Sequence, residues 1–277
     1  MPTPAEDPVR ATPSGYPQRI VCLTDETTET LYLLGEEWRI VGISGFTERP
    51  ARARREKPRV SAFTSARIRR ILELAPDLVL GFSDRQADIA AELIRAGLNV
   101  HVFNQRSVAQ ILGMIRALGG MIGCEAKTAA LLEQLEAGLV TVRARAAALA
   151  RRPRVYFEEW DAPLISGIGW VAELIGLAGG EECFPELAAK GLGRERIIAD
   201  PLEVVRRAPD IVLGSWCGKR FQPAEVGARP GWSAVPAVRG GFVREIKSTI
   251  ILQPGPAALT DGVQAIQAVI EEWARAS

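Results

Sequence analysis

The sequence is poor in histidine: His101 is the only one among 277 residues. A metal site built from several histidines is therefore excluded, and a Ser-His-Asp triad is disfavoured. His101 lies within the apolar run NVHVFN (99–104), which predicts a strand. We expect it to be a core or edge residue.

Cysteine is also scarce and widely spaced, as Cys22, Cys124, Cys183 and Cys217. The absence of a C-x-x-C pair and of a dense framework disfavours a disulfide scaffold, so we expect free, buried thiols. Cys217 follows Trp216 and has two interpretations. It is either a small apolar filler or a soft ligand for a metal centre. Glu159 is the second candidate ligand of such a centre.

No apolar run approaches the roughly 20 residues of a membrane helix. The start, MPTPAEDPVRATPSGYPQ, lacks the apolar core of a secretory signal. We therefore expect residues 1–18 to be a disordered leader, no membrane insertion, and a cytoplasmic location. A periplasmic location is the alternative if the true start lies upstream or a signal was removed. The near-neutral net charge of +1 gives no argument for a nucleic-acid partner.

Strand and helix patterns alternate along most of the chain. A helical pattern runs almost without a break from 107 to about 150, and the alternation then restarts at RVYFEEW (154–160). This order predicts an α/β protein with two Rossmann-like lobes of mostly parallel sheets, joined by one long α-helix. The expected parts are lobes at 19–120 and 153–277, with the connecting helix at 121–152.

An internal repeat supports two similar lobes. IRRILELAPDLVLGF (68–82) matches LEVVRRAPDIVLGSW (202–216), each combining a helix, Ala-Pro-Asp and an apolar strand. Ligands of open α/β sheets bind beyond the carboxyl ends of the strands. We therefore expect these ends to face one another across a ligand.

Large and polar side chains gather in the segments that follow the strands. Exposed aromatic side chains are costly, so either the lobes or a ligand must bury them. We expect one of Glu158 and Glu159 to reach the cleft. The alternative is that one carboxylate points to solvent and the other pairs with a lysine or arginine. The basic run ARARREKPR (51–59) is a solvated connector or a surface that faces a phosphate or an acidic partner. The candidate ligand-binding residues are Asp25, Glu26, Phe46, Phe63, Phe82, Glu158, Glu159, Trp160, Ile168, Trp170, Trp216, Lys219 and Lys247.

From Arg19 to Trp273 the chain resembles the cobalamin and ferric-siderophore group of ABC-transporter substrate-binding proteins, and most of all the vitamin B12-binding branch. The resemblance rests on RIVCLTDETTETLYLLG, ILELAPDLVLG, the long helix and LEVVRRAPDIVLG. It implies a class III periplasmic-binding-protein-like fold, no catalysis and no required cofactor. The ligand would be a cobalamin or another metal chelate. By position, Phe46, Phe63 and Phe82 would form one wall of the site, and Trp160, Ile168, Trp170 and Trp216 the other.

The same resemblance implies docking to a membrane permease through one surface glutamate in each lobe. Those positions carry Arg69 and Leu202, although Glu73 and Glu203 lie nearby. A cytoplasmic carrier, sensor or cofactor chaperone therefore stays open. So do an enzyme on a nitrogenase- or chelatase-like fold and a direct metal-ion binder that uses cleft carboxylates and Cys217.

Overall fold

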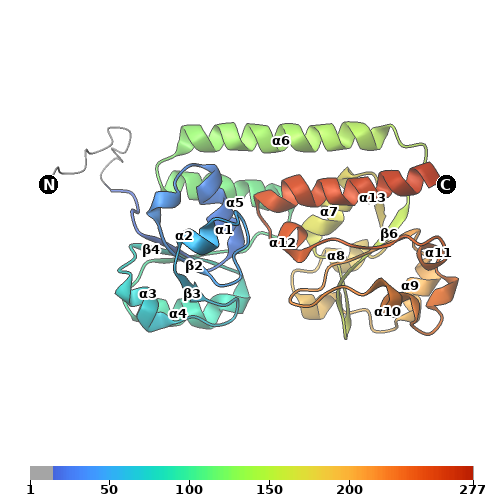
Figure 1. Cartoon of the computed structure of the whole chain (residues 1–277), viewed down its shortest axis with the longest axis horizontal. Coiled ribbons are helices and arrows are strands. Elements are labelled where there is room, and N and C mark those ends of the chain that lie inside the picture. The colour runs from blue at the N-terminus through green and yellow to red at the C-terminus, as the bar shows by residue number, and fades with distance from the viewer. Residues whose placement is uncertain (1–14, 277) are drawn as a thin grey trace.

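The structure, a computed structural model, describes residues 15–276. Two α/β lobes lie side by side, and helix α6 (Glu125–Ala147) runs along both of them (Figure 1). The predicted fold class is thereby confirmed: each lobe carries a mostly parallel sheet, and one long helix joins the lobes.

Lobe one contains a fully parallel sheet with the strand order β3-β2-β1-β4-β5. Its strands are β1 (Ile20–Cys22), β2 (Ile40–Ser44), β3 (Arg59–Ser61), β4 (Leu78–Phe82) and β5 (Val100–Phe103). Its helices are α1 (Asp25–Leu33), α2 (Ala53–Glu56), α3 (Ile68–Glu73), α4 (Ala87–Arg95) and α5 (Val108–Met121), with 3-10 turns at Glu37–Arg39 and Asp84–Gln86.

Lobe two has the strand order β10-β9-β6-β7, in which β7 alone is antiparallel, and β8 pairs with the start of β6. Its strands are β6 (Arg154–Asp161), β7 (Leu164–Ser166), β8 (Glu181–Glu182), β9 (Ile211–Gly214) and β10 (Val243–Glu245). Its helices are α7 (Gly169–Leu177), α8 (Pro185–Ala188), α9 (Leu202–Arg207), α10 (Pro223–Gly227), α11 (Pro236–Arg239), α12 (Ser248–Ile251) and α13 (Val263–Ala276). Shorter turns lie at Gly193–Arg196, Trp232–Ala234 and Ala258–Gly262.

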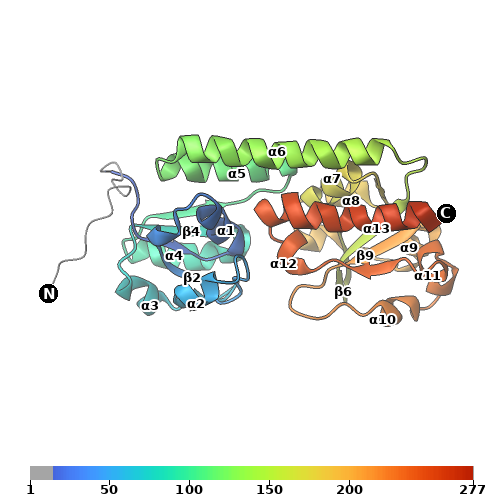
Figure 2. The ribbon, with the colours of Figure 1, turned by 45° about the horizontal axis from the view of Figure 1, so that its top comes forward.

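Both sheets are apolar on their two faces, as expected for parallel strands covered by helices. In β1, Ile20 and Cys22 face one core while Val21 faces another, which follows from the two-residue period of a strand. The core on the α5 and α6 side continues from lobe one into lobe two and includes residues of α7 and α13. The lobes therefore share one apolar core. Helix α6 lies over the helices α5 and α7, which contribute to this core from the two lobes (Figure 2).

The nearly continuous helix predicted from 107 to 150 is broken in the structure. Helix α5 ends at Met121 and α6 begins at Glu125, because Gly123 adopts a left-handed φ of +69°. A Cβ at Gly123 would also lie 2.6 Å from the ring of Tyr16. The two helices therefore fold back on one another, and α6 packs along α5 as well as along α7 and α13.

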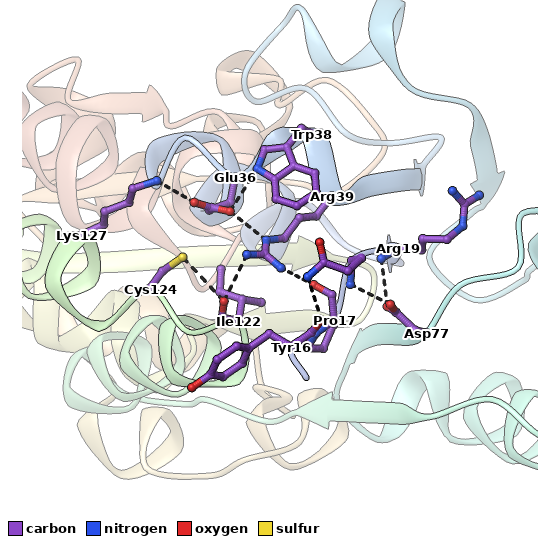
Figure 3. Close-up of polar contacts among 11 residues, drawn as sticks. Tyr16, Pro17, Arg19, Glu36, Trp38, Arg39, Asp77, Ile122, Cys124 and Lys127 are labelled. Atoms are coloured by element: carbon purple, nitrogen blue, oxygen red, sulfur yellow. Dashed lines mark hydrogen bonds and ion pairs between the residues drawn. The ribbon is translucent and has the colours of Figure 1, made fainter. Parts of the chain in front are cut away.

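A buried arginine fixes the start of α6 on lobe one (Figure 3). The Arg39 guanidinium donates to the Pro17 carbonyl, to the Ile122 carbonyl at 3.3 Å and to the Glu36 carboxylate at 2.8 Å. Glu36 also accepts from Lys127 of α6 at 2.6 Å. These bonds hold the described residues before β1 against the α5–α6 turn.

The repeated Ala-Pro-Asp segments make the same local structure in both lobes. Ala75 and Ala208 both have a positive φ, at 43° and 46°. The following Asp77 and Asp210 each accept a backbone N–H at the start of the first strand of their lobe, from Arg19 at 2.9 Å and Arg154 at 2.8 Å. The motif therefore closes the loop between a helix and the sheet at equivalent places.

The expected leader differs in part from the structure. Residues 1–14 lie outside the described residues, but Gln18 donates its backbone N–H to Asp77 at 2.7 Å and so belongs to lobe one. At the other end of the chain, the π-helical turn Ala258–Gly262 runs directly into α13.

Candidate functional site at the interlobe boundary

The segments that follow the lobe-one strands meet lobe two through the stretch 248–261. The Gln105 side chain, beyond β5, donates to the Pro254 carbonyl at 2.8 Å. Glu26, beyond β1, packs so closely against Gly255 that a Cβ there would lie 2.5 Å from the Glu26 Cβ. The carboxyl ends of the lobe-one strands therefore face the second lobe, as the fold predicts.

Asp25 is buried and positions a loop. Its carboxylate accepts the backbone N–H groups of Glu48 and Arg49 at 3.1 and 3.4 Å, and burial raises its pKa to about 7. These bonds fix the chain just after Phe46. Asp25 thus orders the loop that carries one of the candidate aromatic residues.

Glu26 is fully buried beside lobe two. Its Oε1 accepts from the Thr24 hydroxyl at 2.6 Å, whereas its Oε2 has no hydrogen-bond partner among the described residues. Burial raises its pKa to about 7. A half-satisfied carboxyl in this position binds a proton readily near neutral pH.

Glu29 and Arg49 link the lobes through charge. Glu29 accepts from Arg49 at 2.8 Å and from the backbone N–H of Ala257 at 3.0 Å. Arg49 in turn pairs with Asp261 at 2.9 Å. This chain of ion pairs joins α1 and the loop after β2 to the residues that precede α13.

The three candidate phenylalanines of lobe one differ in exposure. Phe46 and Phe63, on the loops after the neighbouring strands β2 and β3, are 64% and 38% exposed. Phe82 is buried, and the Arg106 guanidinium lies 5.0 Å from its ring centre. Two large apolar side chains are therefore left to solvent at one edge of the sheet.

Arg106 marks the place where the two lobes approach. It pairs with Asp84 at 3.7 Å, and a Cβ at Gly169 of lobe two would lie 2.5 Å from the Arg106 carbonyl oxygen. Burial lowers its pKa, and the charges of Arg196 and Glu159 in lobe two act on it as well. This arginine is thus held at the boundary between the lobes.

In lobe two, Lys219 covers two candidate tryptophans. Its ammonium lies 5.0 Å from the ring centre of Trp160 and 4.5 Å from that of Trp216, and it pairs with Asp161 at 2.6 Å. Trp160 is partly exposed, whereas Trp216 is buried. The lysine therefore occupies a cation–π position at this edge.

Both candidate glutamates form ion pairs. Glu158 is completely buried and binds Arg229 at 2.6 and 2.8 Å while also accepting from Tyr156 and Trp216. Glu159 forms a two-point pair with Arg196 at 2.7 and 3.0 Å. Both glutamates thus pair with an arginine, whereas the alternative interpretation expected this of only one and placed the other in solvent. Ligand contact by Glu159 remains a prediction.

The remaining candidates separate into buried and exposed groups. Ile168 and Trp170 lie in the shared core, where the Trp170 indole donates to the Ile251 carbonyl at 2.8 Å. A ligand could reach them only after covering segments move. Lys247 and Cys217 are exposed, so Cys217 is not a buried filler. Desolvation and the nearby Glu159 charge raise the pKa of its thiol, which disfavours the thiolate.

Within residues 15–276 no group of three or more histidine, cysteine or acidic side chains is placed to hold a metal ion. Asp25 and Glu26 lie in lobe one and the ion-paired Glu158 and Glu159 in lobe two. The direct metal-ion hypothesis, which needs these carboxylates together with Cys217, gains no support from this arrangement.

Arginines are the site residues that sequence reasoning missed. Arg106, Arg196 and Arg229 neutralise or bridge boundary groups from positions far along the chain. Arg106 lies two residues after the predicted strand 99–104, so its place after a strand could have indicated it. Arg196 and Arg229 lie in irregular segments, and their partners are 37 and 71 residues away, so no local pattern indicates them.

Comparison with known proteins places the chain in a family. The family model described as periplasmic binding protein matches residues 20–250, which span both lobes. The chain belongs to the periplasmic binding protein family. The resemblance to substrate-binding proteins of ABC transporters is thereby confirmed, as is the expectation of a binding protein and not an enzyme.

Individual relatives agree with this assignment. A vitamin B12-binding protein of Vibrio parahaemolyticus is 23% identical over 246 residues, covering 87% of this chain and 86% of the relative. The uncharacterized ABC transporter substrate-binding lipoprotein YvrC of Bacillus subtilis is 24% identical over 257 residues, covering 90% and 78%. A periplasmic haem-binding protein from Pseudomonas aeruginosa shares the fold with a TM-score of 0.75, at 21% identity and 92% coverage of both chains.

The expected cytoplasmic location finds no support in these comparisons, because the matched family is one of periplasmic proteins and one relative is a lipoprotein. Among the described residues, no helix combines the length and apolarity needed to cross a lipid bilayer.

Proposed function

We propose that this protein is the substrate-binding component of an ABC importer and holds a cobalamin or a similar metal chelate, such as haem, between its lobes. The observation that carries the proposal is the pair of exposed phenylalanines, Phe46 and Phe63, on adjacent loops at the sheet edge that faces lobe two. Leaving such side chains in water is costly, and a large apolar ligand would cover them.

The opposite lobe supports the same ligand class. Trp160 is partly exposed beside Lys219, and the adjacent Glu159 interacts by charge with Arg106 of lobe one, so apolar area is combined with a few charged groups. Sites of this composition suit large ligands that gain area from apolar walls and orientation from a small number of polar contacts. The relatives named for vitamin B12 and haem binding cover most of this chain.

Absorbance spectroscopy tests the ligand class directly. The purified protein is mixed separately with cyanocobalamin, haemin and a ferric siderophore, desalted, and scanned for a retained chromophore. We expect one of them to remain at about one molecule per chain. Absence of any retained chromophore, together with no thermal shift, would refute the proposal.

We also propose that the protein works outside the cytoplasm with a permease partner. The docking positions expected from the resemblance carry Arg69, which pairs with Glu73 at 3.2 Å, and Leu202, which is 45% exposed. Glu203 is ion-paired with Arg206 and Arg207. A contact made by Glu73 and Glu203 would therefore exchange these internal pairs for permease arginines. Co-purification with the permease, lost in a Glu73→Gln, Glu203→Gln variant, tests this arrangement.

A further inference from the structure

The segment from Arg52 to Arg70 is the most basic part of lobe one. It contains eight lysines and arginines and a single acidic residue, Glu56. The chain as a whole is balanced, with 34 basic and 33 acidic residues, so this concentration is local. Like charges held close together repel one another, and the fold must tolerate that cost.

The fold arranges this segment around one groove. Helix α2, the edge strand β3 and the start of α3 enclose a cavity of about 750 Å³. It is lined by five cationic side chains and by no carboxylate, the cations being Arg54, Lys57, Arg59, Arg67 and Arg70. The charges are thus gathered on one concave surface.

The cations that line the groove differ from Arg52 and Arg69 nearby in that they form no ion pairs within the part of the chain that the structure describes. Outside the groove, Arg52 pairs with Glu37 at 2.9 Å and Arg69 pairs with Glu73 at 3.2 Å. Within residues 15–276, none of the five lining cations forms an ion pair with a carboxylate. The nearby acidic groups therefore neutralise Arg52 and Arg69 outside the groove and leave the five lining cations available to an anion.

Two polar groups of the groove, the Lys57 ammonium and the Ser61 hydroxyl, are shielded from water without a compensating ion pair or hydrogen bond from the described part of the chain. Lys57 is half-buried, and desolvation lowers its pKa even though Glu56 and Glu37 lie near enough to raise it. The Ser61 hydroxyl is buried and has no hydrogen-bond partner among the described residues. A bound oxyanion would satisfy both, since it accepts hydrogen bonds and restores a counter-charge.

We infer that the groove between α2, β3 and α3 binds a small anion carrying two or more phosphate groups, either free or as a lipid headgroup. Guanidinium groups bind phosphate oxygens in a two-point geometry, and several of them around one cavity favour a polyanion over a single charge. The inference is independent of the chelate site. The groove nevertheless adjoins it, because Gly45 and Ala62 of its lining directly precede Phe46 and Phe63.

Titration of the full chain with tripolyphosphate tests the free anion. Titration with phosphatidylcholine vesicles that contain cardiolipin, whose headgroup carries two phosphates, against pure phosphatidylcholine vesicles tests the headgroup. The test variant is Arg59→Gln, Arg67→Gln, which removes two exposed lining cations. The matched control is Arg69→Gln, because Arg69 is a neighbour that does not line the groove. Losing two charge-assisted contacts should weaken anion binding by at least about tenfold, while the control binds like wild type.

Thermal unfolding without any anion at low salt supplies the second measurement. We expect the double variant to melt at a higher temperature than wild type, because repulsion in the groove is relieved, and Arg69→Gln to show no such rise. Binding of tripolyphosphate alone identifies a free anion, and binding of anionic vesicles alone identifies a headgroup. No binding in either arm, or equal weakening in the control, overturns the inference and leaves the chelate proposal untouched.

Discussion

The carboxylate of Glu158 is completely buried, and its hydrogen-bond partners come from separate segments of lobe two. Arg229 supplies two hydrogen bonds, and Tyr156 and Trp216 supply one each. A buried ion that keeps all its partners is tolerated, whereas one that loses its counter-charge is strongly destabilising. Lobe two therefore depends on Arg229 to balance the buried charge of Glu158.

An Arg229→Met variant should lose roughly 3–5 kcal/mol of unfolding free energy in urea titrations, because the buried Glu158 carboxylate would lose its counter-charge. Adding Glu158→Gln should restore part of that loss. Arg69→Met removes an exposed pair and should cost no more than about 0.5 kcal/mol. A loss below about 1 kcal/mol for Arg229→Met would show that Glu158 is not held as a buried carboxylate that needs Arg229 as its partner.

The buried Glu26 predicts a pH effect with a defined sign. Its pKa in the folded protein is raised from 4.5 to about 7, so the folded state holds a proton that the unfolded state has released. The resulting stability is present at acidic pH and is lost as the pH rises through about 7.

Unfolding free energies measured from pH 5 to 8 should therefore decline more steeply in wild type than in a Glu26→Gln variant. The difference in slope is at most about 1.4 kcal/mol per pH unit. Glu73→Gln, an exposed control, should follow wild type. Parallel curves for wild type and Glu26→Gln would contradict the raised pKa.

At the scale of elements, periodicity predicted most of the order of strands and helices, because helix and strand periods are local properties. The turn at Gly123 was missed, since a lone glycine in a helical pattern does not specify a left-handed conformation. The arginine partners of Glu158 and Glu159 were missed for a different reason. Arg229 and Arg196 reach their partners only when distant segments fold together, and no local pattern specifies that.

The α5–α6 turn gives a test at this scale. Gly123→Ala would force a side chain into a left-handed residue that lies against Tyr16, and should destabilise the protein by about 1–3 kcal/mol in urea titrations. Gly120→Ala lies within α5 with open space around it, so it should be neutral or stabilise by up to about 1 kcal/mol. Equal effects of the two substitutions would contradict the turn geometry.

In the repeated Ala-Pro-Asp loops, a substitution by glycine is expected not to lower the stability of the protein. Ala75 and Ala208 both have left-handed φ values, which glycine adopts without strain. Ala75→Gly or Ala208→Gly should leave stability unchanged or raise it by up to about 1 kcal/mol by differential scanning calorimetry. Ala130→Gly on the exposed side of α6 should instead lower it by about 1 kcal/mol. If Ala75→Gly lowered stability as much as Ala130→Gly, the backbone strain inferred from the left-handed φ of Ala75 would be contradicted.

At the scale of the whole molecule, one apolar core passes beneath α6 from lobe to lobe. The Arg49–Asp261 ion pair joins the lobes, and Arg106 lies where they approach. The sequence predicted this architecture and two exposed aromatic residues of the candidate site. It also nominated Phe82, Trp170 and Trp216, which the structure buries. Position after a strand places a side chain at the boundary but does not say whether neighbouring segments cover it.

Titration of the retained chelate against two matched variants tests the central claim most directly. Phe46→Ala, Phe63→Ala removes the exposed aromatic side chains at the lobe boundary, whereas Leu33→Ala removes an exposed apolar side chain from the end of α1. We predict at least about tenfold weaker binding in the double variant and wild-type affinity in Leu33→Ala. Equal affinities in the two variants would contradict a chelate site on these residues.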